Sequence, residues 1–399
     1  MIGGGVVGLS CAAGLARAGH AVTVCEASDG RDAASWNNAG HIATEQVAPL
    51  ASIAALRSAP GRRFAAGGAL DLPWRMAPRW LPFAARMIAA ARPARFRAGS
   101  AALGALLAEA MPAWRRSPAA DLLREAGHLV AWENAARAAK GRAAWGAAET
   151  GTATFRDADA ADLAALAALT DRVAGAIRFT GSGQVADLAA LADRLEAAVR
   201  AAGGTIRRER ADLRVAGGRA VVAGQEADLV LVAAGVRSAP LMAAAGHRAP
   251  IIAERGYHVR AAADRWPADL PPVVFEDRSL IVTRYADCVQ AASFVELGDP
   301  DAPADPRKWE RLEAHVVDLG LPITPPCTRW MGSRPTLPDY LPAIGRSSRA
   351  PNLLYAFGHQ HLGLTLAPVT AEIVVALVAG KDVPVPITPF DLDRFGGRP

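Results

Sequence analysis

The sequence predicts an α/β fold, in which a doubly wound sheet is accompanied by a second, α+β domain built on a mixed or antiparallel sheet. A glycine-rich turn at residues 3–8 is followed by a helix and a strand pattern, and residues 187–245 again alternate between helix and strand patterns. Residues 251–326 instead alternate between apolar and polar side chains, as an antiparallel sheet does. The length of 399 residues exceeds the usual size of one hydrophobic core, which favours two domains.

The composition is that of a globular protein rather than a disordered one, with 51% hydrophobic and 21% charged residues. The net charge of +5 is too thinly spread to indicate a nucleic-acid partner. The cysteines form no Cys-x-x-Cys pair and no signal peptide precedes them, so we expect neither a zinc site nor disulfides, and a cytoplasmic location. They are Cys11, Cys25, Cys288 and Cys327. We see no apolar run of about 18 residues and expect no membrane-spanning segment.

The opening turn carries the clearest motif, Gly-x-Gly-x-x-Gly at Gly3, Gly5 and Gly8, with Val6 and Val7 between them. In a strand–turn–helix unit the first glycine allows the tight turn and the second lets a pyrophosphate approach the backbone. The third permits close packing of the helix on the sheet. The helix that follows offers unpaired N–H groups and a positive dipole end to phosphates. The turn is therefore a candidate dinucleotide site.

The residues after the turn complete such a unit in register. Residues 9–18 carry an apolar face of small side chains, Gly19 ends the helix, and residues 21–25 form a buried strand pattern. Glu26 follows about 20 residues after the turn, where a carboxylate can accept both hydroxyls of an adenosine ribose. A lone glycine motif also occurs as a structural turn, but the complete unit favours a Rossmann-like domain. An acid at this position disfavours NADP.

The first strand of the unit is short, because only Met1 and Ile2 precede the glycines. Strands usually have about 5–6 residues. This strand lies in the middle of such sheets, where missing residues leave the backbone groups of the neighbouring strands without hydrogen-bond partners. We therefore expect the natural chain to begin a few residues upstream of Met1.

Residues 57–97 contain nine arginines and a single acid, Asp71, interleaved with large apolar side chains. Helices are expected over residues 81–92 and 101–113. One interpretation is an amphipathic helical region with solvated arginines. The other is a contact with an anionic membrane surface, which would make the protein peripheral to the inner membrane, or with a redox partner.

The patterns divide the chain into two discontinuous domains. The dinucleotide-binding domain is expected to contain residues 1–50, 181–250 and 327–399. The second, substrate domain is expected to contain residues 51–180 and 251–326. The chain has a single glycine-rich fingerprint. A flavin disulfide reductase, which holds both FAD and NADPH, would need another, so that class is excluded.

Three motifs at the two ends of the chain carry a resemblance to a known family. They are the fingerprint through Glu26, the segment Ser35…Asn38-Ala39-Gly40, and the run W-x-G-x-R-P…D…P-x-I-G…N-L…G-H…L-G over residues 330–363. In these motifs the sequence resembles the FAD-dependent D-amino acid dehydrogenase and oxidase (DAO) family, nearly over its whole length. The amino-acid sequence of residues 38–42 and 358–363 looks most similar to that of members that act on 4-hydroxy-D-proline.

The resemblance implies that FAD is bound by residues from both ends of the chain. The cofactor-binding residues that it implies are Gly3, Gly5, Val6, Val7, Gly8, Glu26, Ala27, Ser35, Asn38, Ala39, Gly40, His41, Val185, Ala234, Gly235, Gly332, Arg334, Gly358, His359, His361, Leu362, Gly363, Leu364 and Thr365. Gly358 and His359 are expected near the pyrimidine end of the flavin. The helix expected from Leu366 would direct its dipole to the same edge.

The family chemistry is oxidation of an amino acid to its imino acid, with the α-hydrogen leaving as hydride to the flavin. Arg334 matches the arginine that clamps the substrate carboxylate, the alternative being a surface ion pair. Tyr257 is the candidate hydroxyl partner of that carboxylate, or else a packed aromatic. His41 touches flavin or substrate, or is a structural loop histidine. Arg284 and Glu296 are candidates for contacts with a substrate ring, or are exposed on the sheet.

Several alternatives remain open from the sequence. His359 and His361 are two residues apart, a poor spacing for a metal pair, so no metal is expected. Another DAO-family amine oxidase of the glycine or sarcosine type, a flavin monooxygenase, an NAD-dependent dehydrogenase and a non-catalytic nucleotide-binding module are the rival functions. The electron acceptor (oxygen, a quinone or a partner subunit) and a covalent flavin link through His41 stay open.

Overall fold

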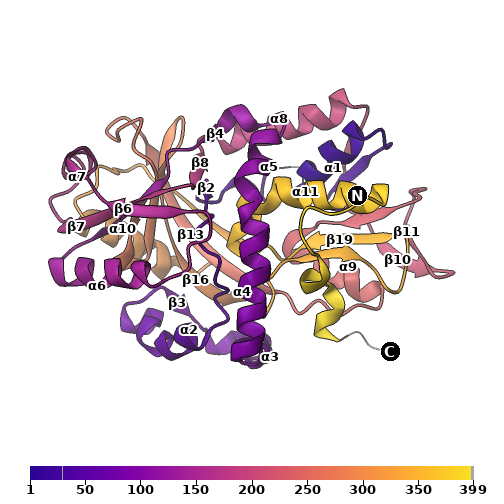
Figure 1. The fold of residues 1–399 in the computed structure, drawn as a ribbon, viewed down its shortest axis with the longest axis horizontal. Coiled ribbons are helices and arrows are strands. Elements are labelled where there is room, and N and C mark those ends of the chain that lie inside the picture. Colours follow the sequence, from indigo (N-terminus) through magenta and orange to yellow (C-terminus); the bar gives the residue numbers. More distant parts are fainter. Residues whose placement is uncertain (29, 397–399) are drawn as a thin grey trace.

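Two sheets divide the molecule, one in each half, and lie side by side along its long axis (Figure 1). The computed structural model describes residues 1–28 and 30–396. Both ends of the chain meet in one half, and most of the middle of the chain builds the other. The helix α4 (Pro93–Ala108) runs across the front between the two halves.

The first sheet is the expected doubly wound sheet, with the order β9-β1-Ile2-β12-β19-β18. Ile2 joins its two parts by parallel bridges to Cys25 and Val232, and its N–H donates to the carbonyl of Leu231 at 2.9 Å. All neighbours are parallel except β18 and β19. The strands are β1 (Thr23–Glu26), β9 (Thr205–Arg208), β12 (Val230–Val232), β18 (Ala343–Arg346) and β19 (Leu353–Phe357).

Helices cover this sheet, and a hairpin extends from it. The helix α1 packs against α8 and α11. The elements are α1 (Val6–Arg17), α8 (Leu188–Ala201), α9 (Ser238–Ala244), α11 (Gly363–Ala379), β10 (Leu213–Ala216) and β11 (Arg219–Val222).

Small residues let α1 approach its neighbours. A Cβ at Gly8 would lie 2.1 Å from the carbonyl oxygen of Gly3, and one at Gly14 would lie 3.0 Å from the Val375 side chain on α11. Gly3 itself has φ +110°, a conformation that favours glycine. The fingerprint glycines therefore set the position of α1 on the sheet, as the motif predicts.

The second sheet has the order β17-β13-β16-β15-β14-β5-β7-β6, with β3 pairing to β16. It is mixed, because β14 runs parallel to β5 and β3 runs parallel to β16, whereas the other neighbours are antiparallel. The strands are β3 (Leu70–Asp71), β5 (His128–Trp132), β6 (Thr154–Asp157), β7 (Gly175–Thr180), β13 (Ile252–Ala262), β14 (Val273–Phe275), β15 (Leu280–Arg284), β16 (Cys288–Gly298) and β17 (Thr328–Thr336).

Helices and a small three-stranded sheet complete the structure. The helix α10 packs on β13 and β16, and the small sheet has the order β2-β8-β4. The elements are α2 (Ile53–Ser58), α3 (Ala77–Ala90), α5 (Ala110–Arg116), α6 (Ala135–Gly146), α7 (Ala160–Ala167), α10 (Pro306–Asp318), β2 (His41–Ile42), β4 (Leu123–Arg124) and β8 (Gly183–Val185).

The expected domain boundaries need two corrections. Strand β17 pairs along its length with β13, so it belongs to the second sheet rather than to the dinucleotide-binding segment 327–399. The helices α4 and α5 pack on α11, although residues 51–180 were assigned to the substrate domain. The indole of Trp114 on α5 donates to the carbonyls of Leu364 and Thr365, each at 3.2 Å. This contact joins segments that are far apart in the chain, so the order of the sequence patterns did not predict it.

The segment Gln360–Ala379 corrects the expectation about apolar runs, because by length and composition it could cross a membrane. Its most apolar window is 61% buried inside the protein, as in the core helix of a soluble protein, so it is weak support for a span. The helix α11 begins at Gly363, three residues before the expected start at Leu366.

A buried cluster of charged groups ties α10 to the second sheet. The Glu296 carboxylate, which is fully buried, binds Arg255 at 2.8 Å, Lys308 at 3.0 Å and the Tyr257 hydroxyl at 2.6 Å. Lys308 also binds Asp71 at 2.7 Å. Burial alone would lower the pKa of Lys308, but its carboxylate partners outweigh burial and raise it. The cluster is satisfied only as long as each charge keeps its partners.

We predict that Glu296→Ala lowers the free energy of unfolding by about 3–5 kcal/mol, because it leaves Arg255 buried without its carboxylate and removes one of the carboxylates that bind Lys308. Urea unfolding followed by tryptophan fluorescence measures this. The control is Glu313→Ala, which breaks the exposed ion pair with Arg329 and should cost less than about 1 kcal/mol. Equal losses in the two variants would contradict the prediction.

Candidate active site

A cavity of about 1570 Å³ lies between the two halves of the molecule. It is larger than the ~300–1,000 Å³ of usual ligand pockets, so it has room for a dinucleotide together with a small substrate. Its walls come from the fingerprint turn, the loop of residues 32–46, strands β13, β16 and β17, and the segment after β19.

The fingerprint turn forms one end of the cavity, where Gly3, Gly5, Val6 and Val7 line the wall. The helix α1 begins here with Gly5 as its N-cap, and no side chain caps it. The N–H of Val6 donates to the Ser35 hydroxyl at 3.0 Å. The first turn of α1 thus borders the cavity, where its other amides and its positive dipole end suit phosphates.

Glu26, at the end of β1, lines the same end of the cavity. Its carboxylate accepts hydrogen bonds from the N–H of Gly4 at 2.5 Å and of Ser28 at 3.0 Å. These bonds fix the orientation of the carboxylate. Because each carboxylate oxygen accepts two hydrogen bonds, both remain able to bind the hydroxyls of a ribose.

The structure does not bring Val185 to this end, contrary to the prediction. Val185 lies in β8, is fully buried and donates its N–H to the carbonyl of Gly40 at 2.8 Å. Residues 210–213 line the cavity instead. These residues follow β9. Ligands of doubly wound sheets bind beyond the carboxyl ends of the parallel strands, so the position of residues 210–213 after a strand could have identified them as site residues.

The loop that carries Asn38 is closed by its own side chain. The Asn38 amide donates to the carbonyl of Ser35 at 2.7 Å and accepts from the N–H of Gly40 at 2.6 Å. Gly40 has φ +67°, and a Cβ there would lie 2.9 Å from the Val185 carbonyl, so only glycine fits. Gly40 shapes the loop but is not itself part of the cavity wall.

The second sheet holds this loop in place. The Tyr285 hydroxyl and the Gln290 side chain donate to the carbonyl of Asn38, at 2.6 and 2.9 Å. Thr283 donates to the carbonyl of Ala39 at 2.8 Å. Side chains of β15 and β16 therefore position a loop that belongs to the dinucleotide-binding half.

The C-terminal segment forms the opposite wall of the cavity, beside the start of α11, which carries no side-chain cap. His359 contacts the Thr370 hydroxyl at 3.0 Å, and burial lowers its pKa to about 3. Gln360, which sequence reasoning missed, lines the cavity and donates to the carbonyl of Tyr340 at 2.8 Å. Its side-chain oxygen is buried and has no partner among the described residues. A hydrogen-bond donor on a bound group fits there.

Arg334 on β17 lies on the cavity wall beside this segment. Its guanidinium group crosses Gly256, where a Cβ would lie 2.4 Å from one guanidinium nitrogen. It donates to the carbonyl of Phe294 at 3.2 Å and has no carboxylate partner among residues 1–28 and 30–396. An ordinary surface ion pair does not describe it, and its remaining N–H groups are available to a substrate carboxylate.

Tyr257 does not fit the role that was predicted for its hydroxyl. That hydroxyl donates to Glu296 and accepts from the N–H of Asp305 at 3.1 Å, within the buried cluster. Because neighbouring residues of a strand face opposite sides, Gly256 and His258 lie on the cavity face of β13, whereas Tyr257 borders the cavity but packs its ring and hydroxyl on the other face. The alternative, a packed aromatic, describes Tyr257.

A different tyrosine brings a hydroxyl-bearing ring to the cavity. Tyr340 lines the wall, is buried, and lies close enough to Glu254 and Arg334 for their charges to act on its pKa. Burial, then Glu254, raises that pKa well above its usual value, so the hydroxyl stays protonated and able to donate.

The two candidates for substrate-ring contacts lie elsewhere. Glu296 is enclosed in the buried cluster on the far face of β13 and β16. Arg284 donates to the backbone carbonyls of Trp266 at 3.2 Å and Tyr285 at 2.9 Å, and it does not line the cavity. Both predictions were wrong, because the sequence pattern did not reveal which face of each strand meets the cavity.

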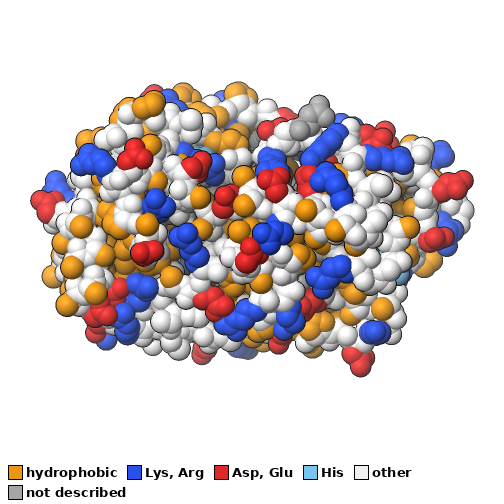
Figure 2. Space-filling view, turned by 90° about the horizontal axis from the view of Figure 1, so that it is seen from above, with side chains coloured by type: hydrophobic (Ala, Val, Ile, Leu, Met, Phe, Trp, Pro, Cys, Tyr) orange, Lys and Arg blue, Asp and Glu red, His pale blue; other side chains and the backbone are white. Residues whose placement is uncertain are grey.

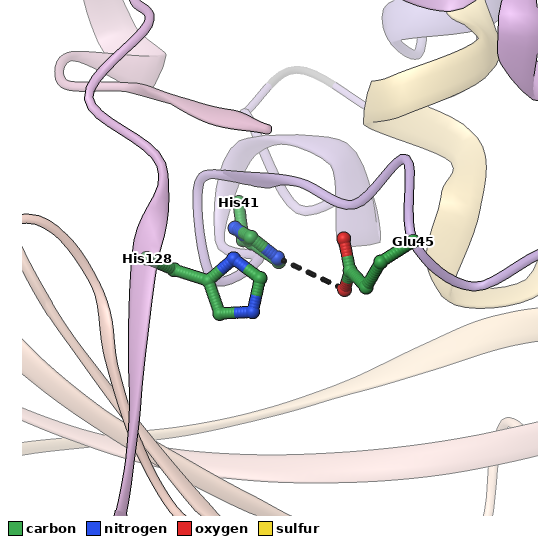
Figure 3. A group of neighbouring side chains, drawn as sticks. All are labelled: His41, Glu45 and His128. Carbon is green, nitrogen blue, oxygen red and sulfur yellow. Dashed lines mark hydrogen bonds and ion pairs between the residues drawn. The ribbon is translucent and has the colours of Figure 1, made fainter. Parts of the chain in front are cut away.

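His41, Glu45 and His128 gather at the cavity wall (Figure 3). His41 contacts the carbonyl of Gly183 at 3.2 Å and Glu45 at 3.4 Å, and its ring meets His128 edge-on at 4.6 Å. Burial alone would raise the pKa of Glu45, but the bond to His41 and the histidine charges lower it to about 2. Burial, then His41, lowers the pKa of His128 to about 3. Glu45 and His128 were not predicted as site residues. The signal available for Glu45 was its position four residues after His41.

Most of the predicted site residues meet at this cavity. Those that line it are Gly3, Gly5, Val6, Val7, Glu26, Ala27, Ser35, Asn38, Ala39, His41, Ala234, Gly235, Tyr257, Gly332, Arg334, Gly358, His359, His361, Gly363 and Leu364. Those outside its wall are Gly8, Gly40, Val185, Leu362 and Thr365. Thr365 instead accepts the N–H of Ala43 at 3.0 Å. The uncapped α1, the acid of Glu26 and the free oxygen of Gln360 together fit FAD.

Known proteins are similar to this chain over nearly its whole length. The chain is 28% identical to the D-amino-acid oxidase of Bradyrhizobium diazoefficiens, over 99% of this chain and 98% of that protein. It is 30% identical to D-amino acid dehydrogenase 2 of Ralstonia nicotianae, over 99% of each.

Solved structures share the fold. The glycine oxidase of Geobacillus kaustophilus superposes with a TM-score of 0.70 at 22% identity, over 98% of this chain and 97% of that one. The L-proline dehydrogenase of P. horikoshii gives 0.70 at 15% identity, over 99% and 96%. The model of the DAO family, described as FAD dependent oxidoreductase, matches residues 1–377. This chain therefore belongs to the DAO family of FAD-dependent oxidoreductases.

Proposed function

We propose that this enzyme oxidises a D-amino acid or a cyclic imino acid to the corresponding imine. The observation that carries the proposal is Arg334, whose guanidinium group faces the same cavity as the flavin-side segments and has no carboxylate partner among the described residues. The names of the two relatives support a D-amino acid as the substrate. 4-Hydroxy-D-proline is our specific candidate.

The residues of the cavity have separable tasks in this reaction. Bound FAD supplies the hydride acceptor. The planar fork of Arg334 holds the substrate carboxylate, and the protonated hydroxyl of Tyr340 donates a further hydrogen bond to it. The enclosing side chains of β13, β16 and β17 exclude water around the α-carbon. The substrate needs only a neutral amine, so no residue has to serve as a dedicated general base.

Anaerobic flavin bleaching tests the proposal directly. We expect D-alanine, D-proline or 4-hydroxy-D-proline to reduce the flavin, and the L-enantiomers not to do so. Glycine and sarcosine belong in the same panel, because reduction by these two alone would assign the glycine and sarcosine type instead. Flavin that no member of the panel bleaches would refute the proposed function.

We predict that Arg334→Leu raises the KM of the amino acid steeply while FAD stays bound, because losing a paired ionic contact costs about 2–5 kcal/mol. Steady-state kinetics with dye reduction and the flavin absorbance of the purified variant measure the two effects. Arg329→Leu is the matched control, since Arg329 lies on the same strand and pairs with exposed Glu313. An unchanged KM in Arg334→Leu would remove Arg334 from the site.

We further propose that the electrons pass to a quinone in an anionic membrane that the protein contacts peripherally. Large apolar side chains are exposed around α2, α3 and the short 3₁₀ helix Trp74–Met76, among the arginines of residues 57–97. Trp74 is 74% exposed and Ile88 is 57% exposed. The opposite face, in Figure 2, shows acidic and basic side chains interspersed. Apolar groups framed by arginines suit an anionic lipid surface.

This surface also adjoins the cavity, because Leu56 of α2 and Phe83 and Met87 of α3 line its wall. A lipid-borne acceptor would therefore approach the redox site from the side that faces the membrane. Electron transfer to oxygen or to a partner subunit needs no membrane surface, so failure to bind lipid would remove the support for a quinone.

We predict that the protein pellets with phosphatidylglycerol vesicles but not with phosphatidylcholine vesicles, and that salt releases it as arginine–phosphate attraction is screened. The double variant Trp74→Ser, Ile88→Ser should lose most of this binding. Val317→Ser is the matched control, since Val317 is 76% exposed on α10. Equal pelleting with both lipids, or none at low salt, would contradict the membrane contact.

A further inference from the structure

Glu45 presents a buried carboxylate oxygen to the cavity without a partner. The residue is only 3% exposed and lines the cavity wall. One oxygen, Oε1, is engaged by His41 at 3.4 Å and by the Gln46 side chain at 3.3 Å. The other, Oε2, has no hydrogen-bond partner among the described residues. Figure 3 shows the carboxylate beside both histidine rings, with only one of its two oxygens joined to His41.

An unpartnered buried carboxylate oxygen is costly, because a charged acceptor has lost water without gaining a donor. The local hydrogen bonds keep Glu45 ionised rather than relieving this cost, since they lower its pKa to about 2 despite burial. A donor carried by the ligand would satisfy the oxygen. Glu45 is therefore suited to recognise a hydrogen-bond donor on whatever occupies this end of the cavity.

Hydrogen bonds connect Glu45 to the part of the cavity that contains Arg334. The side chain of Gln46 donates to Glu45 and contacts the ring nitrogen of His361 with its oxygen. Burial, then the charge of Arg334, lowers the pKa of His361 to about 4, and the charges of Glu45 and His41 also act on it. His361 thus lies within electrostatic range of both Arg334 and Glu45. A substrate held by its carboxylate at Arg334 would direct its other end toward Glu45.

We propose that Oε2 of Glu45 accepts a hydrogen bond from a hydroxyl group on the side chain or ring of the substrate, so that the enzyme selects hydroxylated amino or imino acids. This inference rests on the proposed function and specifies its substrate class. Glu45 is a specificity residue in this role, because it contacts the distal hydroxyl and not the carbon that is oxidised.

A neutral hydroxyl suits the site better than a cation. Arg334 lines the same cavity, so a cationic end of the ligand would meet repulsion from its charge, whereas a neutral hydroxyl would not. The ligand atoms of His41, Glu45 and His128 lie within 4.8 Å of one another, as a metal site would require. They are engaged otherwise, since His41 contacts Glu45 and His128 contacts the Ser182 hydroxyl at 2.8 Å.

The first arm of the test uses the wild-type holoenzyme and needs no variant. Kinetics with D-proline and with the two C4 epimers of 4-hydroxy-D-proline should give one epimer a kcat/KM at least about tenfold above D-proline, because a charged hydrogen-bond acceptor is fixed in space. D-Lysine against D-norleucine tests a cationic donor in the same way. Preference for D-lysine together with no effect of the hydroxyl would overturn the proposal.

The second arm uses Glu45→Gln, which keeps the shape of the side chain but removes its charge. The ratio of kcat/KM for the hydroxylated epimer to kcat/KM for D-proline should fall by about 10- to 100-fold. Glu125→Gln is the matched control, because Glu125 lies on the surface and pairs with Arg115. Flavin content and thermal unfolding of the variants show whether each protein is intact. An equal loss for D-proline and the hydroxylated substrate would place Glu45 at the α-amine and overturn the proposal.

Two further outcomes are informative. A stoichiometric metal in the purified wild-type protein, absent from Glu45→Gln by elemental analysis, would overturn the proposal in favour of a metal site. If D-alanine and D-proline bleach the flavin but hydroxylation has no effect, this inference fails while the proposed function stands. If no amino acid bleaches the flavin, the proposed function itself fails.

Discussion

The cavity depends on the hydrogen bonds through which the second sheet holds the loop of residues 35–41. Tyr285 and Gln290 both donate to the carbonyl of Asn38, and Thr283 donates to that of Ala39. The loop follows the strand that carries Glu26, so these bonds join the dinucleotide-binding half to the wall that carries Arg334. Because backbone carbonyls are the acceptors, the loop's position depends on the three donors rather than on its own side chains.

Strand β13 separates two kinds of polar chemistry by the alternation of its side chains. On the buried face, Arg255 and Tyr257 join the cluster around Glu296, where every charge has a partner. On the cavity face, Glu254 binds the hydroxyl of Thr336, and Gly256 leaves space for the guanidinium of Arg334. The satisfied cluster stabilises the sheet, whereas the groups left with free hydrogen-bonding capacity face the cavity. Gln360 and Glu45 belong to the second group, because each has a buried side-chain oxygen without a partner among the described residues, which a ligand can use.

Sequence reasoning succeeded where a motif fixes local geometry and failed where two distant segments meet. The fingerprint predicted the turn at Gly3, the close packing at Gly8 and the position of Glu26 at the end of β1, because turn, helix and strand are consecutive and their spacing is set by backbone geometry. Tyr257 was assigned to the site from its order in the chain. A one-residue difference in strand register decides which face a side chain occupies, and no local pattern reveals it.

The sequence by itself determined the dinucleotide-binding unit, the antiparallel strands of the second sheet and the candidate arginine on β17. Each of these follows from glycine positions, periodicity or a motif within a continuous segment. Only the tertiary structure decided that α4 and α5 pack on α11, that Glu296 is buried with Lys308, and that Glu45 keeps one oxygen free beside His41 and His128. These contacts join segments far apart in the chain, and their energies depend on burial and on partners that exist only once the two sheets are in place.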